Sequence, residues 1–268
     1  FMTTEPVHNM YYACLQNGSF EYPDTQLLNY GAAGGFVPDG TTSLNWHTTG
    51  KDKQLEIVYA PYAMDASGYN ISDGSVPDGN QCAELNAQAA GTLYQDIMST
   101  PNTKLYWKLS HRGRQGSDTM YLIVAPTKEV ENLKTQNQLI ALKDAILADE
   151  QGYKEKGYYL KTITDDTSGW DSNNEYHSYN GYYEVPEGSY LTRMFFAAGE
   201  TASGNDTVGN FIDDVSFSPL LPEPERNTGY IVVNKIVTGI SETDICKYRV
   251  QIDVRKENEN AIIASEVL

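Results

Sequence analysis

The chain has 268 residues, of which 36 are acidic and 19 are basic, and its formal net charge is -17. This charge repels phosphate backbones and anionic lipid surfaces, so it argues against nucleic-acid binding and against adsorption on membranes. No stretch approaches the roughly 20 apolar residues of a membrane helix, and residues 1–9 lack the basic start and the apolar run of a signal peptide. The three cysteines show no C-x-x-C spacing, which disfavours a zinc site and favours small buried residues.

Residues 11–126 predict short strands separated by Gly, Asn, Asp and Pro. The clearest strands are 54–59 (QLEIVY), 104–109 (KLYWKL) and 119–124 (TMYLIV). In the first of these, Leu55, Ile57 and Tyr59 alternate with their neighbours, which is the period of two that a strand requires. Pro-Asp-Gly at 38–40 and at 77–79 indicates turns, because Pro presets φ and Gly accepts a positive φ.

Residues 127–151 have a different period. Apolar residues recur there at roughly helical spacing, at Val130, Leu133, Leu139, Ile140, Leu142, Ile146 and Leu147. Thr127 is the candidate N-cap, and Gln151–Gly152 the candidate end. We therefore predict one amphipathic helix inserted between strands, which packs against one edge of a sandwich or, alternatively, binds a partner.

Strand patterns resume after the helix. The predicted strands are 190–197 (YLTRMFFA), 211–217 (FIDDVSF), 230–237 (YIVVNKIV) and 248–254 (YRVQIDV). Residues 220–227 are rich in Pro and Glu and predict a linker. The sequence thus predicts an all-β chain with a sandwich at 11–219 and an incomplete β-domain at 228–268, since some 40 residues are too few for a stable sandwich.

Two segments at opposite ends of the first domain carry a resemblance. Asn17-Gly-Ser-Phe-Glu21 and Phe211-Ile-Asp-Asp-Val-Ser-Phe217 are similar to the "N-G-x-F-E … I-D-D-V-S" pair of galactose-binding-like jelly rolls in carbohydrate-binding modules, particularly the xylan- and glucan-binding families. The resemblance implies a jelly-roll β-sandwich whose first and last strands lie side by side. It also implies a structural Ca²⁺ held by a carboxylate from each strand.

Calcium chemistry agrees with these residue types, because Ca²⁺ takes about six to eight oxygen ligands. Glu21 and either Asp213 or Asp214 are the candidate side-chain ligands, with carbonyl groups near 17–19 completing the shell. Neighbouring residues of a strand point to opposite faces, so we expect only one of the two aspartates to be a ligand. Of the two, we favour Asp213. The alternative is that these acids cap turns and face water.

Further motifs extend the resemblance over residues 11–219. They include Trp46-His-Thr-Thr49, Gly79-Asn-Gln-Cys-Ala-Glu-Leu-Asn-Ala87 and Trp107-Lys-Leu-Ser-His-Arg-Gly-Arg-Gln-Gly-Ser-Asp-Thr-Met120. Together they resemble a jelly-roll domain of large Gram-positive cell-surface proteins. This implies an extracellular adhesin-like module, part of a larger surface protein, whose partner is a glycan or a host glycoprotein.

The second unit resembles the pilin-like, Cna-B-type Ig domains of the same proteins. The residues that carry this resemblance are Gly229-Tyr-Ile-Val-Val-Asn-Lys-Ile-Val-Thr-Gly239. It implies that Lys235 is the lysine of an intramolecular isopeptide bond, whose Asn would lie beyond Leu268. The alternative is an ordinary exposed strand lysine.

His111, Arg112 and Arg114 form a polar cluster in an otherwise acidic chain. Their side chains are candidates for holding a carboxylate or an array of sugar hydroxyls. Alternatively, Arg112 or Arg114 pins the sheet through an ion pair with Asp118 or Glu84.

Three tryptophans are candidates for stacking on sugar rings: Trp46, Trp107 and Trp170. Trp46 and Trp107 lie on or beside strand patterns, where burial in the core is the alternative. Trp170 lies in a stretch rich in Asp, Asn, Ser and Tyr, which is better placed to meet a ligand.

Catalytic signatures are missing from the sequence. It contains no G-x-S-x-G or H-E-x-x-H motif, and its four histidines are scattered. Carboxylates are plentiful, but a glycosidase needs two of them at a fixed separation, which a sequence does not give. We therefore expect a non-catalytic binding module. The first alternative is a stalk domain without a small ligand, and the second is a hydrolase.

Overall fold

The computed structural model describes residues 12–27, 34–41, 43–62, 76–165 and 176–219, and the backbone of 251–255 and 262–267. The chain divides into two compact units, Phe1–Glu223 and Pro224–Leu268. In the second unit, β12 (Gln251–Arg255) and β13 (Ile262–Val267) pair antiparallel. Lys235 and the predicted strand 230–237 lie outside the described residues, so the pilin-like domain and the exact domain bounds remain predictions.

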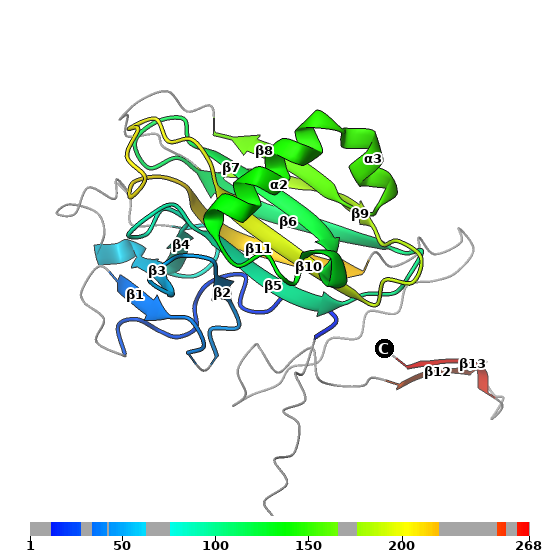
Figure 1. Cartoon of the computed structure of the whole chain (residues 1–268). Coiled ribbons are helices and arrows are strands. Elements are labelled where there is room, and N and C mark those ends of the chain that lie inside the picture. Colours follow the sequence, from blue (N-terminus) through cyan, green and yellow to red (C-terminus); the bar gives the residue numbers. More distant parts are fainter. Residues whose placement is uncertain are drawn as a thin grey trace, which may run out of the picture. The chain divides into compact units, whose positions relative to one another are not determined.

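The first unit is a sandwich of two antiparallel sheets (Figure 1). One sheet contains β1 (Gly34–Pro38), β3 (Gln54–Tyr59), β4 (Gln81–Glu84), β6 (Lys104–Arg112), β9 (His177–Glu184) and β11 (Phe211–Pro219). The other contains β2 (His47–Thr48), β5 (Thr92–Met98), β7 (Thr119–Pro126), β8 (Tyr159–Thr164) and β10 (Leu191–Ala198). The strand orders are β1-β3-β4-β11-β6-β9 and β2-β5-β10-β7-β8. The predicted β-sandwich is therefore confirmed.

The main core lies between the two sheets. Alternate residues of each strand enter it, such as Leu105 and Leu109 of β6 and Leu122 and Val124 of β7. Outside the six-stranded sheet, a smaller cluster gathers Val58, Ala60, Cys82 and Phe211. Cys82 is a buried free thiol, as predicted, whereas Cys14 is half-buried and disulfide-bonded, which the sequence did not predict. The predicted Pro-Asp-Gly turns are also present, with φ of 86° at Gly40 and 78° at Gly79.

The helical insertion consists of three helices, so the prediction of one helix over 127–151 was wrong in its bounds. These are α1 (Thr127–Val130), α2 (Gln136–Ala148) and α3 (Glu150–Glu155). Thr127 caps nothing, because the N-cap of α1 is Pro126. The side chain that caps α2 is Thr135, which forms a reciprocal capping box with Gln138. Asp149 leaves the helical conformation (φ -146°), ends α2 and caps α3, which continues past Gln151–Gly152.

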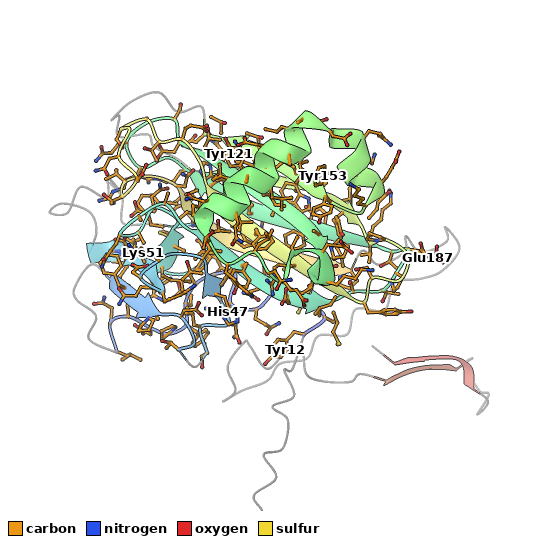
Figure 2. The ribbon with its side chains drawn as sticks, viewed as in Figure 1. Tyr12, His47, Lys51, Tyr121, Tyr153 and Glu187 are labelled. Atoms are coloured by element: carbon orange, nitrogen blue, oxygen red, sulfur yellow. The ribbon has the colours of Figure 1, made fainter. Side chains whose placement is uncertain are left out.

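The helices pack on the outer face of the five-stranded sheet rather than on an edge (Figure 1). The buried residues at this contact are Tyr121, Ile123, Ala125, Val130, Leu139, Ile146, Phe195 and Ala197. The Lys143 ammonium of α2 lies 4.9 Å from the centre of the Tyr121 ring. Tyr121 is labelled in Figure 2. Among the described residues, no helix has the length and apolar character to cross a membrane. The helices thus cover the outer face of the five-stranded sheet and leave the outer face of the six-stranded sheet uncovered, although the cluster around Val58 and Phe211 is buried on part of that face.

Candidate functional site

The N-terminal segment lies beside β11, the strand at the other end of the domain. Leu15 N–H donates to the Phe217 carbonyl at 3.1 Å, and Val215 N–H donates to the Gly18 carbonyl at 3.0 Å. A Cβ on Gly18 would lie 1.7 Å from the Val215 oxygen, so only glycine permits this approach. Residues 15–18 form no strand themselves, but the predicted adjacency of the two terminal motifs is present.

Trp46 holds this segment in place. Its Nε1 donates to the Asn17 carbonyl at 2.8 Å, and its ring stacks on Phe20 with centroids 5.0 Å apart. Trp46 is 1% exposed. A glycan has no access to this ring, so the assignment of Trp46 as a sugar-stacking residue is corrected to a core residue.

Glu21 and Asp213 both bind the turn that precedes β4. Glu21 Oε1 accepts from the N–H groups of Asn80 and Gln81, each at 2.7 Å. Asp213 Oδ2 accepts from the N–H of Asp78 at 2.8 Å. Two carboxylates that are far apart in the sequence therefore meet at one turn.

The electrostatic state of these two carboxyl groups is unusual. Burial raises the pKa of Asp213 to about 9, against the lowering effect of hydrogen bonds from the Asp78 and Asp214 amides. Burial also raises the pKa of Glu21. Among the described residues, Asp213 Oδ1 has no hydrogen-bond partner although it is fully buried. A cation nearby would favour the charged form of both groups.

Asp214 does not join this turn. A β-bulge interrupts the pairing of β11 with β6 between Asp213 and Ser216, and Asp214 adopts a φ of 50°. Its carboxylate forms an ion pair with Lys108 of β6. The bulge thus breaks the alternation assumed from the sequence, and Asp214 is corrected from a candidate ligand to an ion-pair partner.

How well a cation fits beside Glu21 and Asp213 depends on the other oxygen ligands that lie near them. No group of three or more His, Cys, Asp or Glu side chains able to hold a metal occurs in the part of the chain that is described. Glu21 and Asp213 alone supply two carboxylates, one with an unpartnered oxygen. This set fits Ca²⁺ only if backbone carbonyls and water provide most of the shell.

Arg114 is locked in a buried ion pair. Its Nη1 donates to both carboxylate oxygens of Glu84 at 2.9 Å, and Gly209 N–H donates to Glu84 Oε1 at 3.0 Å. Glu56 lies opposite Glu84 on the neighbouring strand. Burial and the Glu56 carboxylate raise the pKa of Glu84, whereas the Arg114 guanidinium lowers it. The ion pair that the sequence offered as the alternative reading is therefore present.

The other members of the polar cluster are buried as well. His111 Nε2 bonds Asn210 Oδ1 at 2.8 Å, and the Arg112 guanidinium lies 5.4 Å from the centre of the Phe211 ring. His111, Arg112 and Arg114 are 0%, 2% and 8% exposed. All three are therefore corrected from ligand-binding to structural residues.

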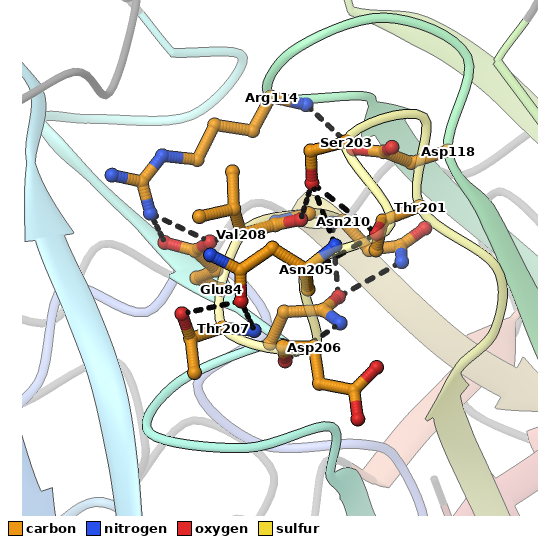
Figure 3. A network of polar contacts seen from close by, with 12 residues as sticks. Glu84, Arg114, Asp118, Thr201, Ser203, Asn205, Asp206, Thr207, Val208 and Asn210 are labelled. Atoms are coloured by element: carbon orange, nitrogen blue, oxygen red, sulfur yellow. Dashed lines mark hydrogen bonds and ion pairs between the residues drawn. The ribbon is translucent and has the colours of Figure 1, made fainter.

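Asp118, the acidic residue of the same motif, accepts hydrogen bonds from two backbone amides. Asp118 Oδ2 accepts from Arg114 N–H at 2.8 Å, and Oδ1 accepts from Ala202 N–H at 2.7 Å. Figure 3 shows how this network continues into the loop from Thr201 to Val208. The motif around Arg114 therefore joins three separate segments at one end of the sandwich.

Trp107 is also a core residue. It is fully buried, and a Cβ on Gly181 of β9 would lie only 2.8 Å from its ring. The assignment of Trp107 as a sugar-stacking residue is therefore corrected. Trp170 lies outside the described residues, and its role remains a prediction.

The outer face of β6, β9 and β11 carries a different set of side chains. Tyr106 lies opposite Tyr182, with ring centroids 5.5 Å apart, and Lys108 lies opposite Asn180. Ser216 and Ser218 of β11 face the same two residues of β6. We call Tyr106, Lys108, Asn180, Tyr182, Ser216 and Ser218 the tyrosine patch. Tyr182 is 51% exposed, so its ring is accessible to a ligand.

A groove of about 1130 Å³ adjoins the patch. Its walls come from the end of α2, from α3, from the outermost strands β8 and β9, and from the segments next to them. Tyr158, Tyr159 and Tyr182 line it together with lysines and glutamates. We call it the edge groove. Glu187, labelled in Figure 2, also lines it.

Comparisons with known proteins found distant structural neighbours. TmCBM61, solved in complex with β-1,4-galactotriose, is 14% identical with a TM-score of 0.40, over 79% of this chain and 100% of that chain. A CBM4 structure is 11% identical with a TM-score of 0.35, over 76% and 99% of the two chains. A family 16 carbohydrate-binding module is 10% identical with a TM-score of 0.32, over 61% and 84%. No family model and no curated protein matches the chain.

Sequence reasoning missed Tyr106 and Tyr182, although a signal was present. In KLYWKL, the residues Leu105, Trp107 and Leu109 share one face, which leaves Tyr106 and Lys108 on the other. Trp107 itself belongs to the buried face. The edge groove had no signal of this kind, because it depends on how helices and strand edges assemble.

Proposed function

We propose that the sandwich domain is a non-catalytic glycan-binding module and that its glycan binds at the tyrosine patch. The observation that carries this proposal is the pairing of Tyr106 with the exposed Tyr182 on a sheet face that the helices leave open. Aromatic rings pack on the apolar faces of sugar rings. The amide, hydroxyl and ammonium groups beside them are the donors and acceptors that sugar hydroxyls require.

The carboxylates around the patch support a non-catalytic role. Asp214 is paired with Lys108, and Glu184 is paired with Lys104 at 3.1 Å. Glycoside hydrolysis needs two carboxyl groups that flank the scissile bond, one of which must donate a proton. Carboxylates held by lysine are poorly suited to that task.

A structural Ca²⁺ is the second part of the proposal. Glu21 and Asp213 would hold it, with backbone carbonyls completing its shell. The ion would neutralise two partly or fully buried carboxylates and would tie the N-terminal segment to β11 and the 78–81 turn. Asp213 Oδ1, which is buried and has no hydrogen-bond partner in the described part of the chain, supports this assignment.

The biological setting is proposed from sequence resemblance alone. It is an extracellular domain of a Gram-positive surface protein that adheres to a glycan or to a host glycoprotein. In that setting the second unit would be a pilin-like domain in which Lys235 forms an isopeptide bond.

A panel of immobilised polysaccharides tests the binding role. We expect affinity gel electrophoresis of the full chain to show retardation by at least one of xylan, galactan, mannan or mixed-linkage glucan. Tyr182→Ala should weaken this binding by up to about tenfold, since one aromatic contact contributes about 0.5–1.5 kcal/mol. Tyr190→Ala is the matched control, because Tyr190 is 71% exposed and lies outside the patch.

The results have distinct meanings. Equal binding by Tyr182→Ala and the unmodified chain would remove the patch from the proposal. A chain that no glycan retards would favour the alternative of a stalk domain without a small ligand.

A further inference from the structure

The edge groove gives the helical insertion a place in ligand binding. Ile146, Leu147, Glu150 and Lys154 from the helices form one wall, and β8 and β9 form the others. Leu147, which is 48% exposed, adds apolar surface to this wall. The volume of about 1130 Å³ exceeds that of the usual small-molecule pocket, roughly 300–1,000 Å³. An open groove of this size suits an extended chain.

Tyr182 connects the groove to the tyrosine patch. Its ring pairs with Tyr106 on the outer face of the sheet, and the same residue lines the groove. A ligand that stacks on Tyr182 from the patch can therefore continue into the groove without leaving the protein surface.

The charges along the groove favour a neutral ligand. The charged residues that line it are Lys104, Lys154, Lys161, Glu150, Glu155, Glu184 and Glu187. Positive and negative groups nearly balance, and Lys104 and Glu184 are paired with each other. The chain as a whole carries a net charge of -17, which repels polyanions. Uronates and sulfated glycans are thus disfavoured, whereas hydroxyl groups can bond both lysines and glutamates.

We infer that the edge groove is an additional glycan subsite, continuous with the tyrosine patch through Tyr182, and that the domain binds within a long, neutral polysaccharide chain. This inference rests on the proposed glycan-binding function. It assigns the inserted helices to ligand binding: α2 and α3 build the wall that extends the site beyond the sheet.

The test compares two double variants of the full chain. Lys154→Ala/Lys161→Ala removes two donors that line the groove and lie away from the patch. Lys128→Ala/Lys134→Ala changes the net charge equally at exposed positions outside the groove. Affinity electrophoresis measures binding to five polymers: xylan, galactan, mannan, mixed-linkage glucan and polygalacturonate. Titration calorimetry with oligosaccharides of increasing length, taken from the preferred neutral polymer, measures how affinity depends on length.

We expect Lys154→Ala/Lys161→Ala to weaken binding of the neutral polymer about fivefold or more, which is the loss of about one hydrogen bond. Binding of the shortest oligosaccharide that the patch holds should stay unchanged, as should binding by Lys128→Ala/Lys134→Ala. A third variant, Tyr106→Ala, removes a ring of the patch. If it loses polymer affinity while Lys154→Ala/Lys161→Ala keeps it, the groove is not a subsite and the patch alone binds the glycan. Preference for polygalacturonate would overturn the neutral ligand, and absence of any binding by the unmodified chain would refute the patch and the groove together.

Discussion

At the scale of single residues, the domain places ionisable groups in its interior and compensates them through specific partners. Glu84 is fully buried and faces Glu56 across the sheet, yet Arg114 binds it with two hydrogen bonds of 2.9 Å. A buried carboxylate without such a partner costs several kcal/mol. The Arg114 guanidinium is therefore engaged with Glu84 in the interior and is unavailable to a ligand.

Replacing Arg114 tests this explanation. Arg114→Met should lower the free energy of unfolding by about 3–5 kcal/mol at pH 8, because it leaves the Glu84 charge uncompensated. The loss should be smaller at pH 5, where Glu84, whose pKa is raised, takes up a proton in the folded state. Urea denaturation measures both values. Lys108→Met is the control: its ion pair with Asp214 is partly exposed, so we expect a loss of about 1 kcal/mol or less.

The bounds of a strand could be predicted from the sequence, whereas the distant partners of buried side chains could not. Alternation predicted β3 at Gln54–Tyr59 to the residue, because the side-chain period of a strand is local. The Arg114–Glu84 ion pair was one of two alternatives that the sequence left open. The bond between His111 and Asn210 was not predicted, because the two residues lie 99 positions apart in the sequence.

At the scale of elements, the helical insertion is divided by its own polar residues. Thr135 and Asp149 each accept a hydrogen bond from a backbone N–H at the start of a helix, and so they set where α2 and α3 begin. Apolar spacing alone predicted a continuous helix, because it reports the buried face and not the caps. This is why the region was identified correctly and its bounds were not.

The capping box provides a prediction at this scale. Thr135→Ala should destabilise the domain by about 1 kcal/mol, since it removes the side-chain acceptor for the Gln138 N–H. Lys134→Ala, at the exposed neighbouring position, should stay within about 0.5 kcal/mol of the unmodified chain. Thermal and chemical denaturation measure the difference. A loss in Thr135→Ala no larger than in the control would show that tertiary packing alone positions α2.

At the scale of the whole domain, the contact between the N-terminal segment and β11 closes the sandwich. The resemblance in the two terminal motifs predicted that Glu21 and Asp213 come together, and the turn at 78–81 joins them. The sequence did not predict the bulge that separates Asp214 from this site. Whether an ion occupies the site has consequences for the stability of the entire domain.

A rise in pH should lower the stability of the domain through Asp213, and bound Ca²⁺ should raise it. Without Ca²⁺, the folded state keeps Asp213 protonated up to a pKa of about 9, whereas the unfolded chain loses that proton near pH 4. The folded state then binds more protons, so stability should fall as pH rises through this window. Ca²⁺ needs the charged carboxylate and should therefore stabilise the domain more at pH 8 than at pH 5.

Melting temperatures in EDTA and in Ca²⁺ measure these effects. At pH 8 we expect saturating Ca²⁺ to raise the melting temperature by about 5–10 °C. Asp213→Asn should abolish this gain and should reduce the fall in stability with pH in EDTA. Asp214→Asn, which alters only the neighbouring ion pair, should keep the gain. Identical melting in EDTA and Ca²⁺ at pH 8 would remove calcium from the account.

The central claim is that glycan binds at the tyrosine patch on the outer face of β6, β9 and β11, and chemical-shift mapping by NMR tests it most directly. The ligand for the titration is a soluble oligosaccharide of whichever neutral polymer retards the chain in affinity electrophoresis. We predict that the largest amide shifts fall on Tyr106, Lys108, Asn180 and Tyr182, with little change around Arg114. Shifts confined to the loop from Thr201 to Val208, or spread evenly over the surface, would contradict the claim.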